Sequence, residues 1–237
     1  MQAGIGSRRP SHVLTHSMRY LLPHSHTHTN LDRIASALAP FDIVALQEAD
    51  AGSFRSHFIH QQEYIAMQAG FDYSHSLVTR ELGPLACMTL GLLARQPWTH
   101  VCEHRLPASR HGRGALEAGF RINGQPVVVI ATHLSLRKSS RMRQMRFLSG
   151  LVNQHRSVIL MGDFNCAPGS REMEHLLNHT RLRGYDGDIP CTFPSWQPRR
   201  RLDHILVSGD LMLVSLRAMP MVCSDHLPVT AEIRLTS

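Results

Sequence analysis

The chain has 237 residues, 43% of them hydrophobic, and its 25 basic and 18 acidic residues give a formal net charge of +7. This length and apolar content exclude an intrinsically disordered chain and suit a folded α/β protein. No apolar run approaches the roughly twenty residues that cross a bilayer, no secretory signal opens the sequence, and the five cysteines form no Cys-x-x-Cys pair. We therefore expect a cytoplasmic monomer with a single domain over residues 1–237, of which residues 1–29 are irregular.

The first half of the chain is predicted to alternate helices with buried strands. Residues 8–28 are polar, rich in histidine and punctuated by proline, with room only for a short helix over residues 16–22. Asn30 is suited to cap a helix that runs to Leu38, because apolar residues then recur on one face. Further along we expect a strand over residues 42–47 that ends at Glu48, a helix over residues 53–69, and strands over residues 85–94 and 98–105.

A hairpin is predicted in the second half, where Asn123-Gly124 separates the strands 115–122 and 125–132. The predicted helix over residues 139–155 is basic and carries Arg141, Arg143 and Arg146. Other elements are expected at residues 158–161, 170–177, 202–208, 213–219 and 229–235, of which only 170–177 is helical. Strands outnumber helices, which favours two packed sheets flanked by helices.

Four of these strand ends carry polar residues. If the ends converge, they gather six candidate site residues: Glu48, Asp163, Asn165, Asp203, Asp225 and His226. Several carboxylates with one amide and one imidazole form a hard-oxygen site for a divalent cation with a base beside it. That composition fits hydrolysis of a phosphate ester.

The motifs occur in a characteristic order. Gly162-Asp163-Phe164-Asn165 precedes Leu202-Asp203-His204-Ile205, and Ser224-Asp225-His226-Leu227-Pro228 follows. Together with Leu46-Gln47-Glu48, Ala131-Thr132-His133-Leu134 and Thr192-Phe193-Pro194-Ser195, they resemble the endonuclease/exonuclease/phosphatase superfamily, which is DNase I-like. The resemblance runs from about residue 30 to the end. It implies a four-layer α/β sandwich with two mainly antiparallel sheets, and a phosphate-ester hydrolase that uses Mg²⁺ or Mn²⁺.

The resemblance also implies a role for each residue at these positions. Glu48 and Asp225 would hold the metal. Asp163 would orient or deprotonate the attacking water, and Asn165 would bind that water or the phosphate. Asp203 would pair with His226, which holds the phosphate. On the substrate side, the resemblance implies that His133 is a phosphate contact or leaving-group proton donor. Arg113, which lies in the segment Gly112-Arg113-Gly114, is a further candidate as a phosphate clamp.

Structural alternatives stay open for several of these positions. Glu48 could instead pair with an arginine, and Asp163 and Asn165 could only cap backbone in an Asx-turn. Residues 199–201, three arginines, either rim the site or lie in a solvated loop. The histidines of residues 24–28 suggest a metal tract, but an exposed loop with incidental affinity for soft divalent ions explains them as well.

The sequence departs from the family at two positions. Family members begin with an apolar strand that ends in Asn, whereas Gln2–Gly6 resembles only the segment that follows it, so we expect that strand to be encoded upstream of Met1. Leu90 stands where the family often has Asn. We therefore keep two alternatives beside a phosphodiesterase or nuclease. One is a catalytically impaired relative that binds anionic ligands or nucleic acid without turnover, and the other is a nucleic-acid-binding module with structural acids.

Overall fold

The structure is a computed structural model that describes residues 27–107 and 112–236. The expectations for residues 8–26, for the first two histidines of the 24–28 tract and for a strand ahead of Met1 lie outside the described residues. No helix in the described ranges has the length and apolar character needed to span a membrane.

The first half of the chain forms two helices and an antiparallel sheet. Its elements are α2 (Thr27–Leu38), β1 (Ile43–Asp50), η3 (Phe54–Ser56), α3 (Gln61–Ala69), β2 (Tyr73–Glu81), β3 (Cys87–Ala94) and β4 (His100–Arg105). Because α2 begins at Thr27, the predictions that residues 27–29 are irregular and that Asn30 caps this helix are wrong. The single helix expected over residues 53–69 is also wrong, since His57 and Phe58 have φ angles of 56° and 59° that interrupt it.

The second half carries the predicted hairpin and the remaining strands. Its elements are β5 (Gly114–Ile122), β6 (Gln125–His133), α4 (Lys138–Val152), β7 (Val158–Asp163), α5 (Arg171–Asn178), β8 (Asp203–Val207), β9 (Leu211–Ala218) and β10 (Val229–Leu235). Asn123 and Gly124 have φ angles of 50° and 80°, as a two-residue type I′ turn requires, so the hairpin of β5 and β6 is confirmed.

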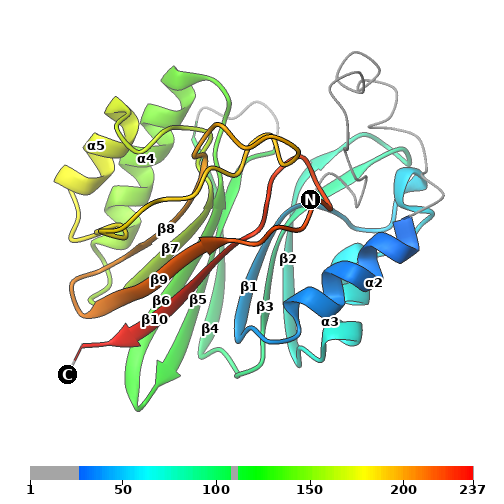
Figure 1. Cartoon of the computed structure of the whole chain (residues 1–237), viewed down its shortest axis with the longest axis horizontal. Coiled ribbons are helices and arrows are strands. Elements are labelled where there is room, and N and C mark those ends of the chain that lie inside the picture. Colours follow the sequence, from blue (N-terminus) through cyan, green and yellow to red (C-terminus); the bar gives the residue numbers. More distant parts are fainter. Residues whose placement is uncertain (1–26, 108–111, 237) are drawn as a thin grey trace.

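Four layers result from this order (Figure 1). The five-stranded sheet has the order β4-β5-β6-β7-β8, and its β6–β7 pair is parallel because α4 crosses between them. Facing it are the sheet β1-β3-β2 and the hairpin β10-β9. Helices α2 and α3 cover β1 and β3, while α4 and α5 cover the other sheet. The predicted α/β sandwich is confirmed. Within the described residues, however, no strand lies between β1 and β10, so one layer is split into two sheets.

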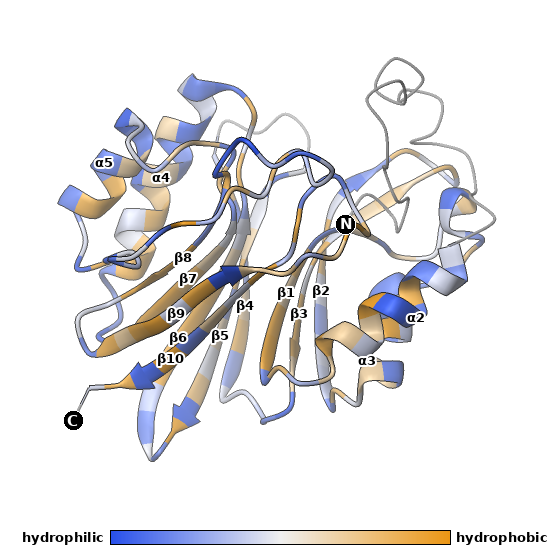
Figure 2. Cartoon of the chain, in the orientation of Figure 1, coloured by the Kyte–Doolittle hydropathy of each residue, from blue (hydrophilic) through white to orange (hydrophobic). Residues whose placement is uncertain are grey.

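Apolar side chains fill the spaces between the layers, and many strand residues are accordingly orange in Figure 2. Between the sheets, Leu92 of β3 packs with Leu116 of β5 and Val129 of β6, all fully buried. Truncating a buried leucine of this kind to alanine usually costs about 2–5 kcal/mol. The tight core holds the strand ends, and therefore the polar groups on them, in fixed positions.

Candidate active site

Three neighbouring strands present their polar residues in one row. His133 at the end of β6 pairs with Asp163 at the end of β7, and Asp163 pairs with Asp203 at the start of β8. Nε2 of His133 lies 3.3 Å from Oδ2 of Asp163. Gly162 allows this row to form, because a Cβ at that position would lie 1.9 Å from the carbonyl oxygen of Thr132. The sheet itself therefore brings together three of the predicted residues.

Asp163 and Asn165 form the tight turn that the sequence suggested. The backbone N–H of Asn165 donates to Oδ1 of Asp163 over 2.8 Å, and its side-chain amide donates to the carbonyl of Leu134 over 2.9 Å. Asn165 has a φ angle of 52°, a conformation that asparagine tolerates better than most residues. The Asx-turn is thus present, but it uses only one carboxylate oxygen of Asp163. The other oxygen faces His133.

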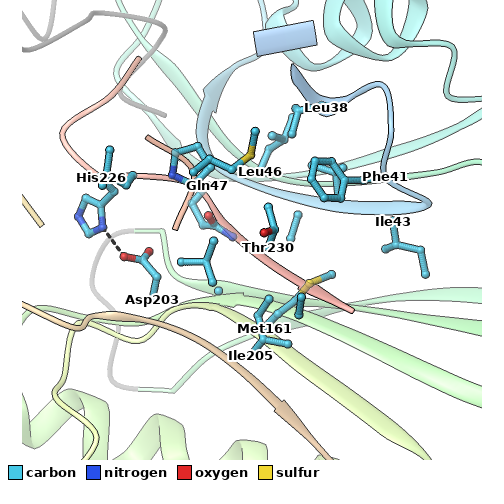
Figure 3. Close-up of a pocket in the computed structure, with 18 of the residues that line it drawn as sticks. Leu38, Phe41, Ile43, Leu46, Gln47, Met161, Asp203, Ile205, His226 and Thr230 are labelled. Carbon is cyan, nitrogen blue, oxygen red and sulfur yellow. Dashed lines mark hydrogen bonds and ion pairs between the residues drawn. The ribbon is translucent and has the colours of Figure 1, made fainter. Parts of the chain in front are cut away.

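His226 and Asp203 are hydrogen-bonded, as Figure 3 shows. Nδ1 of His226 lies 2.7 Å from Oδ2 of Asp203, and the hydroxyl of Thr192 donates to the same oxygen. The ring of Phe193 packs against the imidazole with centroids 4.9 Å apart. No role was predicted for Thr192 from the sequence, although it belongs to the motif Thr192-Phe193-Pro194-Ser195. His204 points away from this site and lies 2.9 Å from the carbonyl of Cys166.

The charges of the site are separated over a short distance. Burial alone would raise the pKa of Asp163, but its hydrogen bond with His133 and the charges of His133 and His226 lower it to about 2. Burial alone would lower the pKa of His226, but the hydrogen bond and charge of Asp203, with Asp163 and Asp225 nearby, raise it to about 9. An ionised carboxylate and a protonated imidazole therefore coexist at neutral pH.

Glu48 stands at a bulge in β1, where the register shifts between Gln47 and Ala49. Its φ angle of 57° turns the side chain out of the regular strand, and its Oε1 lies 3.9 Å from Nη1 of Arg113. Burial disfavours its charge, but the charges of His133 and Arg113 outweigh this and lower the pKa of the carboxyl. β1 does not end at Glu48 as predicted but continues to Asp50.

Asp50 anchors the chain that follows Glu48, and sequence reasoning missed it. It is fully buried and pairs with the fully buried Arg55, whose Nε lies 2.5 Å from Oδ2. Oδ1 accepts from the backbone of Ser53 over 2.7 Å and from the hydroxyl of Ser56 over 2.8 Å. This network fixes the loop after the bulge. The only signal in the sequence was a second acid two residues beyond Glu48.

Three residues could share one metal ion. Asp163, Asp203 and His226 place a ligand atom each within 4.8 Å of one another. The predicted ligands Glu48 and Asp225 are not part of that group, and their metal-binding role stays a prediction. Asp225 is held by Ser224, whose hydroxyl donates to Oδ1 over 3.0 Å. Carboxylate oxygens with one imidazole fit a hard divalent cation such as Mg²⁺ or Mn²⁺.

Arginines border the site on two sides. Nη1 of Arg113 lies 2.6 Å and 2.7 Å from the two ring nitrogens of His133. Arg200 lies over the ring of Phe193, 5.8 Å from its centroid, which places part of the 199–201 loop beside His226. Arg141 differs from the expectation of a basic exposed helix face. It is buried and pairs with Glu172, because Nη2 lies 2.8 Å from Oε1.

A cavity of about 330 Å³ runs from the site into the molecule between β1 and β10. Figure 3 shows Asp203 and His226 at one end and Leu38, Phe41 and Ile43 at the other. Its floor is apolar and comes from the five-stranded sheet, with Val129, Ile159, Met161 and Ile205 among its residues. Asp203 and His226 therefore lie at the edge of an apolar cavity rather than against a filled core.

Comparison with known proteins agrees with this arrangement. The uncharacterized protein YbhP of Escherichia coli is 28% identical over 218 residues, covering 82% of this chain and 83% of YbhP. An endonuclease/exonuclease/phosphatase from Beutenbergia cavernae superposes with a TM-score of 0.75 at 21% identity, covering 86% of this chain and 66% of that one. A mannosyl-6-phosphatase of Bacteroides thetaiotaomicron superposes with a TM-score of 0.71 at 17% identity, over 91% and 97% of the two chains. Residues 21–226 match the Endonuclease/Exonuclease/phosphatase family. The chain therefore belongs to that family, whose members act on phosphate esters.

Proposed function

We propose that this chain is a divalent-metal-dependent hydrolase that cleaves phosphate esters by in-line attack of water, with phosphodiesters as its substrates. The observation that carries the proposal is the pair of opposite charges formed by Asp163 at the end of β7 and His226 in the loop before β10. Asp163 is held ionised and His226 is held protonated, so a proton acceptor and a cationic hydrogen-bond donor face one space. Phosphoryl transfer needs both, because water must lose a proton while phosphate oxygens gain charge.

The carboxylates of Glu48 and Asp225 would hold the metal ion. His226 would not be a ligand, because it is protonated and its Nδ1 is engaged with Asp203. When bound, a divalent cation neutralises the phosphate oxygens and favours ionisation of water. Oδ2 of Asp163, which lies 3.3 Å from both Nε2 of His133 and the side-chain amide of Asn165, would take the proton from the attacking water. His226 donates a hydrogen bond from Nε2 to a non-bridging phosphate oxygen, because its Nδ1 is engaged with Asp203.

The opposite side of the site supports the leaving group. Arg113, whose Nη1 lies 2.6 Å from Nδ1 of His133, would bind a phosphate oxygen through its guanidinium, and His133 would donate a proton as the ester bond breaks. Asn165 keeps Asp163 in place through the turn and adds a side-chain amide at the same edge. The net charge of +7 suits a polyanionic or otherwise negatively charged substrate.

Activity measurements on a small substrate panel test the proposal. Plasmid DNA, bis-p-nitrophenyl phosphate and p-nitrophenyl phosphate would be incubated with the full chain and Mg²⁺ or Mn²⁺, with and without chelator. We expect diester cleavage that chelator abolishes and that Asp163→Asn and His226→Gln reduce by roughly 10²–10⁴-fold. Asp186→Asn, an exposed acid, is the matched control.

Three outcomes would contradict parts of the proposal. Undiminished cleavage by Asp163→Asn would exclude Asp163 as the proton acceptor. Preference for the monoester would reassign the enzyme as a phosphatase. Binding of an oligonucleotide without any turnover by the wild type would instead support a catalytically impaired relative. Leu90, which is buried in β3 where the family often has Asn, is the feature that favours this alternative.

A further inference from the structure

A second group of titratable side chains lies on the α4 side of the five-stranded sheet. Glu117 of β5 is buried, with 7% of its side chain exposed, and three imidazoles surround it. Nε2 of His104 lies 2.9 Å from Oε2, Nε2 of His155 lies 3.1 Å from Oε1, and Nε2 of His100 lies 3.3 Å from Oε1. None of these residues belongs to the row of catalytic groups described above.

The strand register builds this cluster. Cys102 of β4 lies opposite Glu117, so the side chains of His100 and His104, two residues to either side of Cys102, share its face of the sheet. Gly119 leaves the space that the ring of His100 occupies, because a Cβ there would lie 2.3 Å from Cε1 of the ring.

Helix α4 completes the cluster from above. Phe147 of α4 packs edge-on against His104, with ring centroids 6.1 Å apart. His155 follows the end of α4, where its backbone N–H donates to the carbonyl of Val152 over 3.1 Å. Two strands and a helix therefore converge on the carboxylate of Glu117.

The carboxylate lacks a permanent positive partner. Among the residues that the structure describes, Glu117 forms ion pairs only with the three histidines and with no arginine or lysine. An imidazole is a cation only when protonated, and most are neutral above pH 7. Nε2 of His155 is also buried and makes no hydrogen bond of acceptable geometry, although Oε1 is 3.1 Å away. A buried carboxylate without a compensating charge is costly, and a divalent cation would supply that charge.

Ligand chemistry decides which cation fits. Neutral imidazole with one carboxylate is a donor set for zinc and similar transition metals rather than for Mg²⁺. Nitrogen and oxygen atoms bound to one tetrahedral ion at 2.0–2.2 Å lie roughly 3.3 Å apart, close to the 3.1 Å and 3.3 Å that separate His155 and His100 from Oε1. The three rings do not yet meet at one point. Binding of one ion would therefore require the rings of His100 and His104, whose side chains are 43% and 22% exposed, to turn toward a common point.

We propose that Glu117 and the histidines at positions 100, 104 and 155 bind one transition-metal ion of the zinc type, separate from the catalytic metal. Such an ion fastens the end of α4 to the edge strand β4. Its role is therefore structural, since no catalytic residue contacts this cluster. Cys102, exposed on the same face, offers a soft additional ligand.

Zinc titration of the untagged full chain at pH 7.5 tests this site. After chelator treatment, we expect isothermal titration calorimetry to show one zinc ion per chain in addition to any ion bound at the catalytic site. Because an ion that binds only the folded state stabilises it, a hundredfold excess over Kd should raise Tm by about 5–10 °C. Glu117→Gln and His104→Gln should each weaken binding by at least about tenfold, with far-ultraviolet circular dichroism confirming that both variants remain folded.

Control variants separate this site from other zinc ligands. His175 of α5 and His179, which caps this helix, have ring centroids 4.0 Å apart. The double variant His175→Gln/His179→Gln removes this separate histidine pair. Asp163→Asn alters the catalytic group. In both controls, the cluster around Glu117 should bind zinc with the affinity of the wild type. Absence of zinc binding, or unchanged binding in Glu117→Gln and His104→Gln, would overturn the proposal. Loss of the ion assigned to the Glu117 cluster in either control would overturn it as well.

Discussion

His226 and Asp203 are joined by a hydrogen bond of 2.7 Å, and this bond connects the loop ahead of β10 to the first residue of β8. Thr192 donates to the same oxygen of Asp203, so the carboxylate is held from two sides. The imidazole is thereby fixed with Nδ1 toward Asp203 and Nε2 toward the site. Orientation and charge of His226 depend on one acceptor.

The two residues are expected to act as one unit. His226→Ala and Asp203→Ala should each lower kcat/KM for a diester by roughly 10²–10⁴-fold, because each removes the oriented cation. The double variant should lose about as much as the worse single variant, since the second change removes nothing further. Steady-state kinetics of the four proteins measure this coupling, with Glu174→Gln as an exposed control. Losses that multiply would show that the two side chains act independently.

Catalysis should depend on pH through the same imidazole. Because the pKa of Asp163 is lowered to about 2 and that of His226 is raised to about 9, both groups have the required protonation state between these values. At saturating Mg²⁺ we expect kcat/KM to fall as pH rises through about 9. His226→Gln should lose this alkaline limb together with most activity. An alkaline limb that persists unchanged in His226→Gln would assign it to another group.

Stability should follow the same two groups, with opposite signs. The raised pKa of His226 gives a stabilisation that is complete below the ordinary histidine pKa of about 6.5 and is lost as pH rises through about 9. The lowered pKa of Asp163 gives a stabilisation present above its ordinary value of 3.8 and lost as pH falls through about 2. Urea unfolding of wild type and His226→Gln from pH 6 to pH 10 should therefore converge at the alkaline end. A gap that widens with pH would contradict the raised pKa.

Glu48 is expected to set the metal requirement. Glu48→Gln keeps the size of the side chain but removes its charge, so the Mg²⁺ concentration for half-maximal activity should rise at least about tenfold. Titration of activity with Mg²⁺ measures this, and Glu232→Gln, an exposed carboxylate of β10, provides the control. If Glu48→Gln lowers the rate at every Mg²⁺ concentration without shifting the midpoint, Glu48 serves as a partner of Arg113 instead.

Among the arginines of α4, only the exposed Arg143 and Arg146 should contribute to binding of a polyanion, because Arg141 is buried. Arg143→Gln/Arg146→Gln should reduce the slope of log Kd against log salt for duplex DNA by about 2, because each phosphate contact contributes about 0.9. Arg121→Gln/Arg234→Gln, which removes two exposed charges elsewhere, should leave the slope unchanged. Equal slopes for all three proteins would assign the α4 charges to solubility.

The buried pair beneath Glu48 should dominate local stability. Asp50→Ala leaves Arg55 charged in a fully buried position, which typically costs about 3–5 kcal/mol of the free energy of unfolding. Asp210→Ala breaks the exposed pair with Arg156 and should cost little. Urea denaturation compares the two. Similar losses would mean that water reaches Arg55 in the folded protein.

Residues with strong local signals were well predicted. Asn123-Gly124 specifies its own turn, and the apolar run 127–131 specifies a central strand, so β5 and β6 lie close to their predicted bounds. His133 and Asp163 end apolar strands and Asp203 begins one, and the register of the three strands places them side by side. Here the strand pattern and the family resemblance together carry the prediction.

Other features depend on tertiary contacts that no local pattern reports. β2 has few fully buried side chains, so its sequence lacks a strand signal, and it exists because β3 pairs with it. The helix predicted over residues 53–69 does not form as one element, because Asp50 accepts hydrogen bonds from the backbone of Ser53 and the hydroxyl of Ser56 at its start. Arg141 lies on a helix with a basic sequence, but its side chain is buried in an ion pair with Glu172 of α5. Charge patterns cannot distinguish such a buried cation from exposed neighbours.

The cavity between β1 and β10 has a mechanical consequence for turnover. Within the described residues, β10 pairs only with β9, and two-stranded ribbons alone are marginally stable. His226 lies three residues before β10, so its imidazole is attached to this two-stranded ribbon rather than to a larger sheet. Opening of this ribbon would withdraw His226 from Asp203 while the five-stranded sheet stays intact. Amide hydrogen exchange in β10 and the catalytic rate should consequently respond together to any change that fills or enlarges this space.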